Sequence, residues 1–126
     1  QGAARVPAET FGAPPTGTWC EIYEKADLAR QLGDWAGVVD LWGRAQVLGV
    51  TPQGPVENLP FIEAFAHSGQ WETALQLSRD TAQAGPDEVA MVCRLWARIE
   101  RETGAGADRD AAASQIRTEM DCEEHK

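Results

Sequence analysis

Apolar side chains recur along most of this chain at the three- and four-residue spacing of helices. β-branched residues are few, and the apolar–polar alternation that marks a half-buried strand is not sustained anywhere. Six periodic stretches can be followed, over residues 22–32, 38–48, 61–66, 71–82, 89–99 and 111–120. The sequence therefore predicts an all-α fold of about six helices, arranged as three antiparallel hairpins.

A short turn motif occurs twice between these stretches. Gly33-Asp34-Trp35 recurs as Gly69-Gln70-Trp71, at a spacing of 36 residues. Glycine is the usual residue for the left-handed conformation that ends a helix, and an aspartate directly after it can cap the next helix. Both copies are therefore predicted to be tight turns between the two helices of a hairpin.

Other local signals mark helix ends and domain limits. Thr18 and Glu21 have the spacing of a capping box, Asn58 is a candidate cap for the third helix, and Gly104 is expected to end the fifth. Residues 1–15 contain prolines and glycines without periodicity, which is typical of an extended linker or leader. We expect one helical domain over residues 16–122 and a frayed tail over 123–126.

Charge and hydropathy narrow the class of partner. Twenty acidic residues against 11 basic residues give a net charge of −9, and a field of this sign repels the phosphate backbone, so no nucleic-acid partner is predicted. No stretch approaches the roughly 20 apolar residues that span a bilayer, so this fragment is not expected to insert into a membrane. Because the chain starts at Gln1, we interpret it as part of a longer protein or as a mature product. It is then either tethered to a membrane through a missing upstream segment or cytoplasmic.

Motifs for catalysis or cofactor binding are not recognisable. The sequence contains no nucleophile-elbow serine, phosphate-binding glycine loop or H-E-x-x-H pair. His67 stands alone near a predicted helix end, where capping of carbonyl groups or solvent exposure is the expected role. The tail around Cys122 and His125 contains residue types that bind metals, but a terminus lacks the surrounding contacts that fix a metal site. No enzyme activity, cofactor or metal is therefore predicted.

The three cysteines, Cys20, Cys93 and Cys122, lack the paired spacing of zinc or redox sites. We interpret them as small apolar core residues or bystanders. The alternative is a bridge between Cys93 and Cys122, which requires both to sit at the open end of one antiparallel hairpin with Cα atoms within about 7 Å.

The glycine–aromatic turns resemble those of the tetratricopeptide repeat family, whose units of about 34 residues also place a small residue in the second helix. The resemblance covers residues 16–122 and implies a right-handed array of helical hairpins. Several departures make the repeats degenerate: Val38 and Ile62 stand where small residues are usual, and the third unit keeps only Gly104. Its structural positions are Gly33, Trp35, Val38, Gly69, Trp71, Ala74, Trp96 and Gly104.

The same resemblance implies that a protein or peptide binds on the concave face formed by the first helix of each hairpin. Arg94, Arg98 and Arg101 share one helix stripe, where guanidinium groups could capture an acidic segment. The alternative is a solvated surface, which is the commoner role of such charges. Asparagines that the family uses to hold a peptide carboxylate are not present at these stripes. Carried over position by position, the partner-binding residues are Tyr23, Asp27, Arg30, Leu59, Glu63, His67, Arg94, Arg98 and Arg101.

A second resemblance rests on the run Thr18–Arg30 and on Leu59–Ala64. These segments look like the soluble C-terminal part of large bacterial multipass membrane proteins, which are similar to lipid-linked-sugar glycosyltransferases. Three functions are therefore expected from the sequence. The first is a non-catalytic protein- or peptide-binding module within a larger protein, the second an accessory domain of a glycosyltransferase-like membrane protein, and the third a self-association module.

Overall fold

The computed structural model describes residues 17–123 of the chain. This part contains helices and no β-strand, which confirms the all-α prediction. The predicted linker over 1–15 lies outside the described residues, as does all of the predicted tail except Glu123. The elements are α1 (Trp19–Gln31), α2 (Trp35–Leu48), the 3-10 helix η1 (Pro55–Asn58), α3 (Leu59–His67), α4 (Trp71–Ala82), α5 (Pro86–Glu102) and α6 (Ala107–Glu119).

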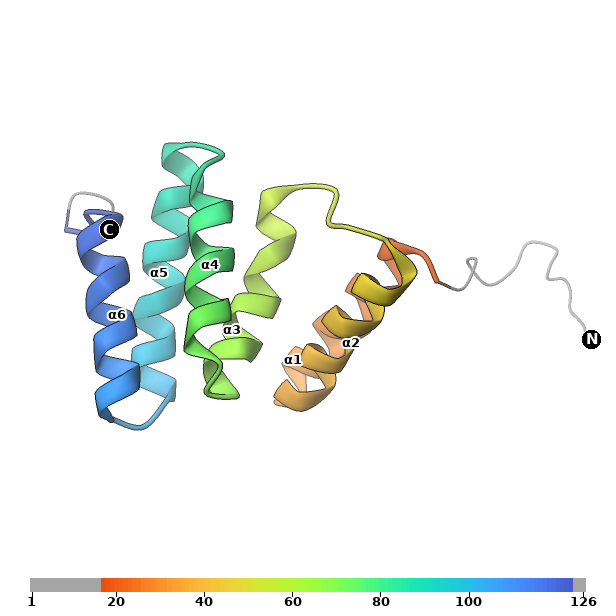
Figure 1. Ribbon diagram of the computed structural model, residues 1–126, viewed down its shortest axis with the longest axis horizontal. Coiled ribbons are helices and arrows are strands. Elements are labelled where there is room, and N and C mark those ends of the chain that lie inside the picture. Colours follow the sequence, from red (N-terminus) through yellow and green to blue (C-terminus); the bar gives the residue numbers. More distant parts are fainter. Residues whose placement is uncertain (1–16, 124–126) are drawn as a thin grey trace, which may run out of the picture.

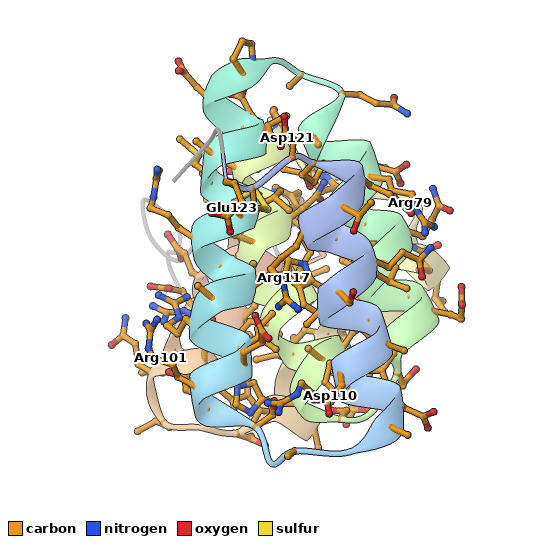
Figure 2. The ribbon with its side chains drawn as sticks, turned by 90° about the vertical axis from the view of Figure 1, so that its left-hand side faces the viewer. Arg79, Arg101, Asp110, Arg117, Asp121 and Glu123 are labelled. Carbon is orange, nitrogen blue, oxygen red and sulfur yellow. A yellow bond between two sulfur atoms is a disulfide. The ribbon has the colours of Figure 1, made fainter. Side chains whose placement is uncertain are left out.

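The helices lie side by side in two layers (Figure 1). Consecutive helices pack in pairs, α1 with α2, α3 with α4 and α5 with α6. Helix α3 contacts both α1 and α5, so these three helices form one layer, while α4 packs against α6 in the other. Figure 2 looks at the end of the molecule formed by α5 and α6, where Arg101 extends from α5 and Arg79 from α4 on the opposite side. None of the helices in the described part is long and apolar enough to cross a bilayer.

The core lies between the two layers. Its side chains come from every helix, because each contributes one apolar stripe at helical spacing. Two polar residues of α4, Ser78 and Thr81, are fully buried with it, and both are hydrogen-bonded. Ser78 accepts a bond of 2.8 Å from the indole of Trp96 and donates to the carbonyl of Ala74. Thr81 donates to the carbonyl of Leu77 at 2.8 Å. The largest fully buried apolar residues are Trp96, Phe61, Ile22, Ile62, Ile99, Ile116, Val38 and Val92.

Both glycine–aromatic motifs form the predicted turns. Gly33 and Gly69 have φ angles of 73° and 77°, in the left-handed region that disfavours a side chain. The carboxylate of Asp34 caps α2 by accepting from the amide of Gly37 at 3.0 Å. Thr18 caps α1 by accepting from the amide of Glu21 at 3.2 Å.

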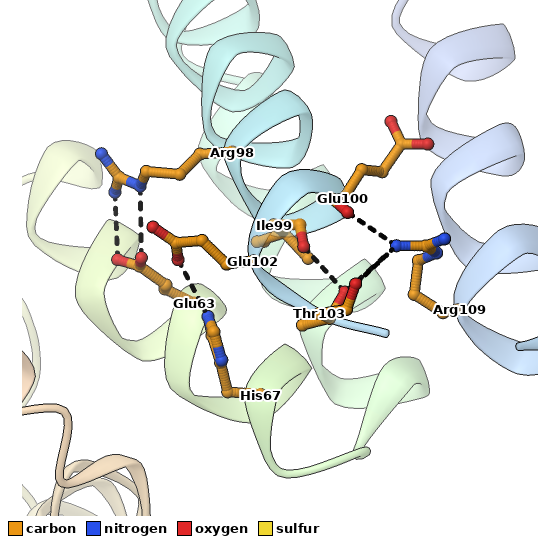
Figure 3. Close-up of polar contacts among 8 residues, drawn as sticks. All are labelled: Glu63, His67, Arg98, Ile99, Glu100, Glu102, Thr103 and Arg109. Atoms are coloured by element: carbon orange, nitrogen blue, oxygen red, sulfur yellow. Dashed lines mark hydrogen bonds and ion pairs between the residues drawn. The ribbon is translucent and has the colours of Figure 1, made fainter. Parts of the chain in front are cut away.

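Two expected helix-end residues behave differently. Asn58 ends η1 and makes no side-chain cap for α3; its amide instead donates to Thr81 on α4 at 3.1 Å. Gly104 does not adopt the left-handed conformation of the other two turn glycines. Helix α5 ends before it, because the guanidinium of Arg109 donates to the carbonyls of Glu100 and Thr103 at 2.7 and 3.0 Å (Figure 3). A cationic side chain therefore bonds the last carbonyl groups of α5, at the place where a left-handed glycine was expected to end the helix.

The tryptophans of the two turns are half-buried, and each contacts the next helix along the chain. The ring of Trp35 stacks on that of His67 at the end of α3, with centroids 4.2 Å apart and planes 11° apart. Trp71 lies against Trp96 of α5, at 6.1 Å between centroids. Trp19 is buried in the core, at 5% exposure. These two ring contacts of Trp35 and Trp71 join α2 to α3 and α4 to α5.

A disulfide joins Cys93 of α5 to Cys122, just after α6, with Cα atoms 5.5 Å apart. Both residues are buried, as expected for core cysteines, but our preferred interpretation of them as unpaired is wrong. The sequence does not show how the two helices pack: α6 lies against α5, so the residues just after the end of α6 reach the middle of α5. Cys20 is exposed and free.

Candidate functional site

The first helices of the three pairs place most of the predicted partner-binding residues in two adjoining hollows. One hollow, of about 230 Å³, lies between α1, α3 and α5. Its lining includes Tyr23, Asp27, Arg30, Leu59, Glu63 and Arg98. The sequence thus grouped side chains that are distant along the chain but share one face in the structure.

The second hollow, of about 380 Å³, lies between α3 and α5 and shares Leu59 and Arg98 with the first. Three of its lining residues are the predicted arginines, and none is acidic. Leucine and methionine side chains form the rest of the lining, so the hollow combines apolar and cationic side chains. Its lining residues are Leu59, Met91, Arg94, Leu95, Arg98 and Arg101.

Arg98 is held by an acidic neighbour. Its Nη2 and Nε atoms donate to the two carboxylate oxygens of Glu63 at 3.0 and 3.2 Å (Figure 3). Glu63 is only 3% exposed, whereas the Arg98 side chain is 44% exposed. The sequence placed Glu63 on a ligand-facing surface, but in the structure its carboxylate is occupied by Arg98. This pair joins α3 to α5 and orients the guanidinium in the shared part of the hollows.

The other two arginines of the stripe are available to a ligand. Arg94 and Arg101 are exposed, and neither forms an ion pair with another residue in the part of the chain that the structure describes. Each lies about one helical turn from Arg98 on α5, so all three guanidinium groups face the same hollow. An anionic group could contact them without breaking an internal salt bridge.

The α1 side of the face is more neutral. Arg30 donates to Asp27 at 3.2 Å within α1, so its charge is largely balanced there. Partial burial raises the pKa of the Tyr23 hydroxyl, and the nearby carboxylates of Asp27 and Glu57 raise that pKa further. Tyr23 therefore stays protonated at neutral pH and can donate a hydrogen bond to a ligand.

His67 lies beyond the two hollows, one turn after Glu63 on α3. Its Nε2 is 3.1 Å from Oε1 of Glu102 on α5 (Figure 3), and its ring stacks on Trp35. The sequence assigned neither partner to His67. Glu102 is 35 residues away along the chain, and no local pattern indicates such a contact.

Comparisons with known protein families, with curated proteins and with solved structures found no match to this chain. The functional argument therefore depends on the charges and shape of the face formed by α1, α3 and α5. That face offers cationic donors, one phenol and apolar contacts, which are chemical means of binding a peptide.

Proposed function

We propose that this chain is a non-catalytic docking module, a tetratricopeptide-like array within a larger protein, that binds an acidic peptide segment across α1, α3 and α5. One observation carries the proposal. In a chain of net charge −9, the hollow between α3 and α5 is lined by three arginines and no acidic residue. A local cationic surface on an acidic protein favours an anionic partner.

The chemistry of the hollow suits a carboxylate. A guanidinium group can donate two parallel hydrogen bonds to one carboxylate, and charge-assisted bonds of this kind are stronger than neutral ones. Leu59 and Met91 are half-buried beside the arginines, so an apolar residue next to the acidic one would also lose contact with water. An acidic segment with interspersed apolar residues is therefore the preferred ligand.

A fluorescein-labelled peptide of alternating glutamate and leucine tests this proposal by fluorescence anisotropy. We expect Arg94→Ala and Arg101→Ala each to weaken binding about tenfold or more, because each removes a charge-assisted contact. Arg44→Ala is the matched control, since Arg44 is an exposed arginine on α2, and it should change the affinity less than twofold. Equal losses in all three variants would show a non-specific charge effect and reject the proposed face.

Self-association is the second candidate, and exposed aliphatic side chains favour it. Leu28 of α1 and Leu32, which follows the last residue of α1 directly, are 57% and 75% exposed. Such a stripe at the end of a helical array can pack against a second copy. Sedimentation equilibrium tests this function. Self-association of the wild type that is abolished in Leu32→Glu would support it, and a monomer at every concentration would reject it.

An accessory role in a glycosyltransferase-like membrane protein stays a hypothesis from the sequence. It is supported only by the residues of α1 and α3 that carry the resemblance. A parent gene product with many apolar spans upstream would support it, and a product without them would reject it.

A further inference from the structure

Three side chains that can bind metals converge between α3 and α5, at one end of the helical face. Glu63 and His67 are four residues apart on α3 and therefore share one side of that helix. Glu102, the last residue of α5, faces them. Oxygen or nitrogen atoms of the three residues all lie within 4.8 Å of one another.

One of these separations is close to what a metal ion requires, and the others need only a small movement of side chains. Ligand atoms about 2.0–2.2 Å from a tetrahedral zinc ion are roughly 3.3–3.6 Å apart. His67 Nε2 and Glu102 Oε1 are 3.1 Å apart. Glu102 is 41% exposed, so its side chain can rotate to bring the three ligands around one ion. Its exposure also leaves a side open for a coordinating water molecule.

The imidazole of His67 is held in one orientation before any ion binds. It stacks on Trp35 at 4.2 Å between centroids, and its side chain is only 13% exposed. With the ring held in this way, Nε2 points at Glu102 (Figure 3). A ligand that is held in place loses little conformational freedom on binding, which favours affinity.

Glu63 can bind an ion without losing Arg98. A carboxylate has about four lone-pair sites, and Arg98 uses one on each oxygen. Each oxygen keeps a lone pair that Arg98 does not use, and the guanidinium fixes the plane of the carboxylate. Hydrogen bonding of a ligating carboxylate by a neighbour is a usual feature of metal sites.

We propose that Glu63, His67 and Glu102 form a binding site for a divalent transition-metal ion, with zinc as the test ion. One imidazole and two carboxylates are donors that suit Zn²⁺. The bound ion connects α3 to α5 and therefore stabilises the packing between the second and third helix pairs. The site shares Glu63 with the hollow between α1, α3 and α5, but Arg94 and Arg101, which test the docking proposal, supply no ligand to the ion, so the two proposals can fail separately.

Isothermal titration of the tag-free chain with ZnCl₂ tests the site, and the chain offers a matched control. It has two histidines, His67 and His125. We expect His67→Gln to weaken zinc binding at least tenfold and His125→Gln to leave it unchanged. The exposed ligand gives a second pair: Glu102→Gln should weaken binding at least tenfold, and Glu100→Gln, which removes the same charge two residues away, less than twofold.

Cobalt substitution gives an independent readout. A paramagnetic Co²⁺ ion on His67 quenches the fluorescence of the stacked Trp35, so Trp35→Phe should reduce the quenched signal more than Trp71→Phe. Three results would overturn the site: no zinc binding up to millimolar concentration, binding lost in His125→Gln but kept in His67→Gln, or equal weakening by Glu100→Gln and Glu102→Gln. The last two would assign the ion to the tail or to surface charge.

Discussion

Replacing Arg98 with alanine should destabilise this protein more than its exposed position suggests. The variant removes both donors to the carboxylate of Glu63, which is 3% exposed. Removing one partner of a buried ion pair typically costs 3–5 kcal/mol, because the other charge stays buried and unpaired. Here the Arg98 side chain is 44% exposed, and water can enter the space that it leaves. We therefore expect a loss of about 2–3 kcal/mol in the free energy of unfolding.

Urea unfolding followed by far-ultraviolet circular dichroism measures this loss. Arg94→Ala is the control, because Arg94 is an exposed arginine one turn earlier on α5 without an ion pair to another described residue; its effect should stay within about 0.5 kcal/mol. Adding Glu63→Gln to Arg98→Ala removes the unpaired charge and should recover about 1 kcal/mol or more. Equal stabilities of Arg98→Ala and Arg94→Ala would refute the structural role of the pair.

This result also decides how binding data are interpreted. If Arg98 supports the packing of α3 against α5, a loss of peptide affinity in Arg98→Ala combines a lost contact with a disturbed face. The peptide experiment therefore uses Arg94 and Arg101, whose side chains are exposed and form no ion pair with another described residue.

Further predictions concern the disulfide, the core and acid stability. Replacing Cys93 and Cys122 with alanine should lower the free energy of unfolding by about 3–4 kcal/mol, from a sequence separation of 29 in the chain-entropy description; urea unfolding checks this. Trp96→Ala, at a 1% exposed position, should cost about 3–5 kcal/mol, again by urea unfolding. The hydrogen bond from Arg79 holds the pKa of Glu119 below its usual 4.5, so the pair stabilises the fold above that pH and loses its effect as pH falls through the lowered pKa. The difference in thermal unfolding between wild type and Glu119→Gln should thus be present at pH 7 and shrink as the pH falls below 4.5.

Local signals in the sequence were sufficient to predict the helices and several of the residues at which they begin or end. Gly33 and Gly69 adopt the left-handed conformation expected of them, and Thr18 and Asp34 cap the helices that follow. These outcomes depend on residues within a few positions of each other. The order of periodic stretches and turns in the sequence was therefore enough to predict the order of the helices.

Contacts between segments that are distant along the chain could not be predicted from local signals. The pairing of Cys93 with Cys122 and the contact of His67 with Glu102 depend on how α5 meets α6 and α3. Glu63 lines the hollow between α1, α3 and α5, but its burial and its pairing with Arg98 depend on the packing of α5 and have no local sequence signal. At the end of α5, the last carbonyl groups are bonded by Arg109, whereas the sequence indicated a helix end at Gly104.

The docking face is tested most directly by nuclear magnetic resonance of the ¹⁵N-labelled protein during titration with the glutamate–leucine peptide. The account predicts that amide shifts concentrate on α1, α3 and α5, with the largest changes around Leu59, Arg94 and Arg101, and that α2 and α6 change little. Shifts concentrated on α2 and α6, or no shifts at millimolar peptide, would contradict it.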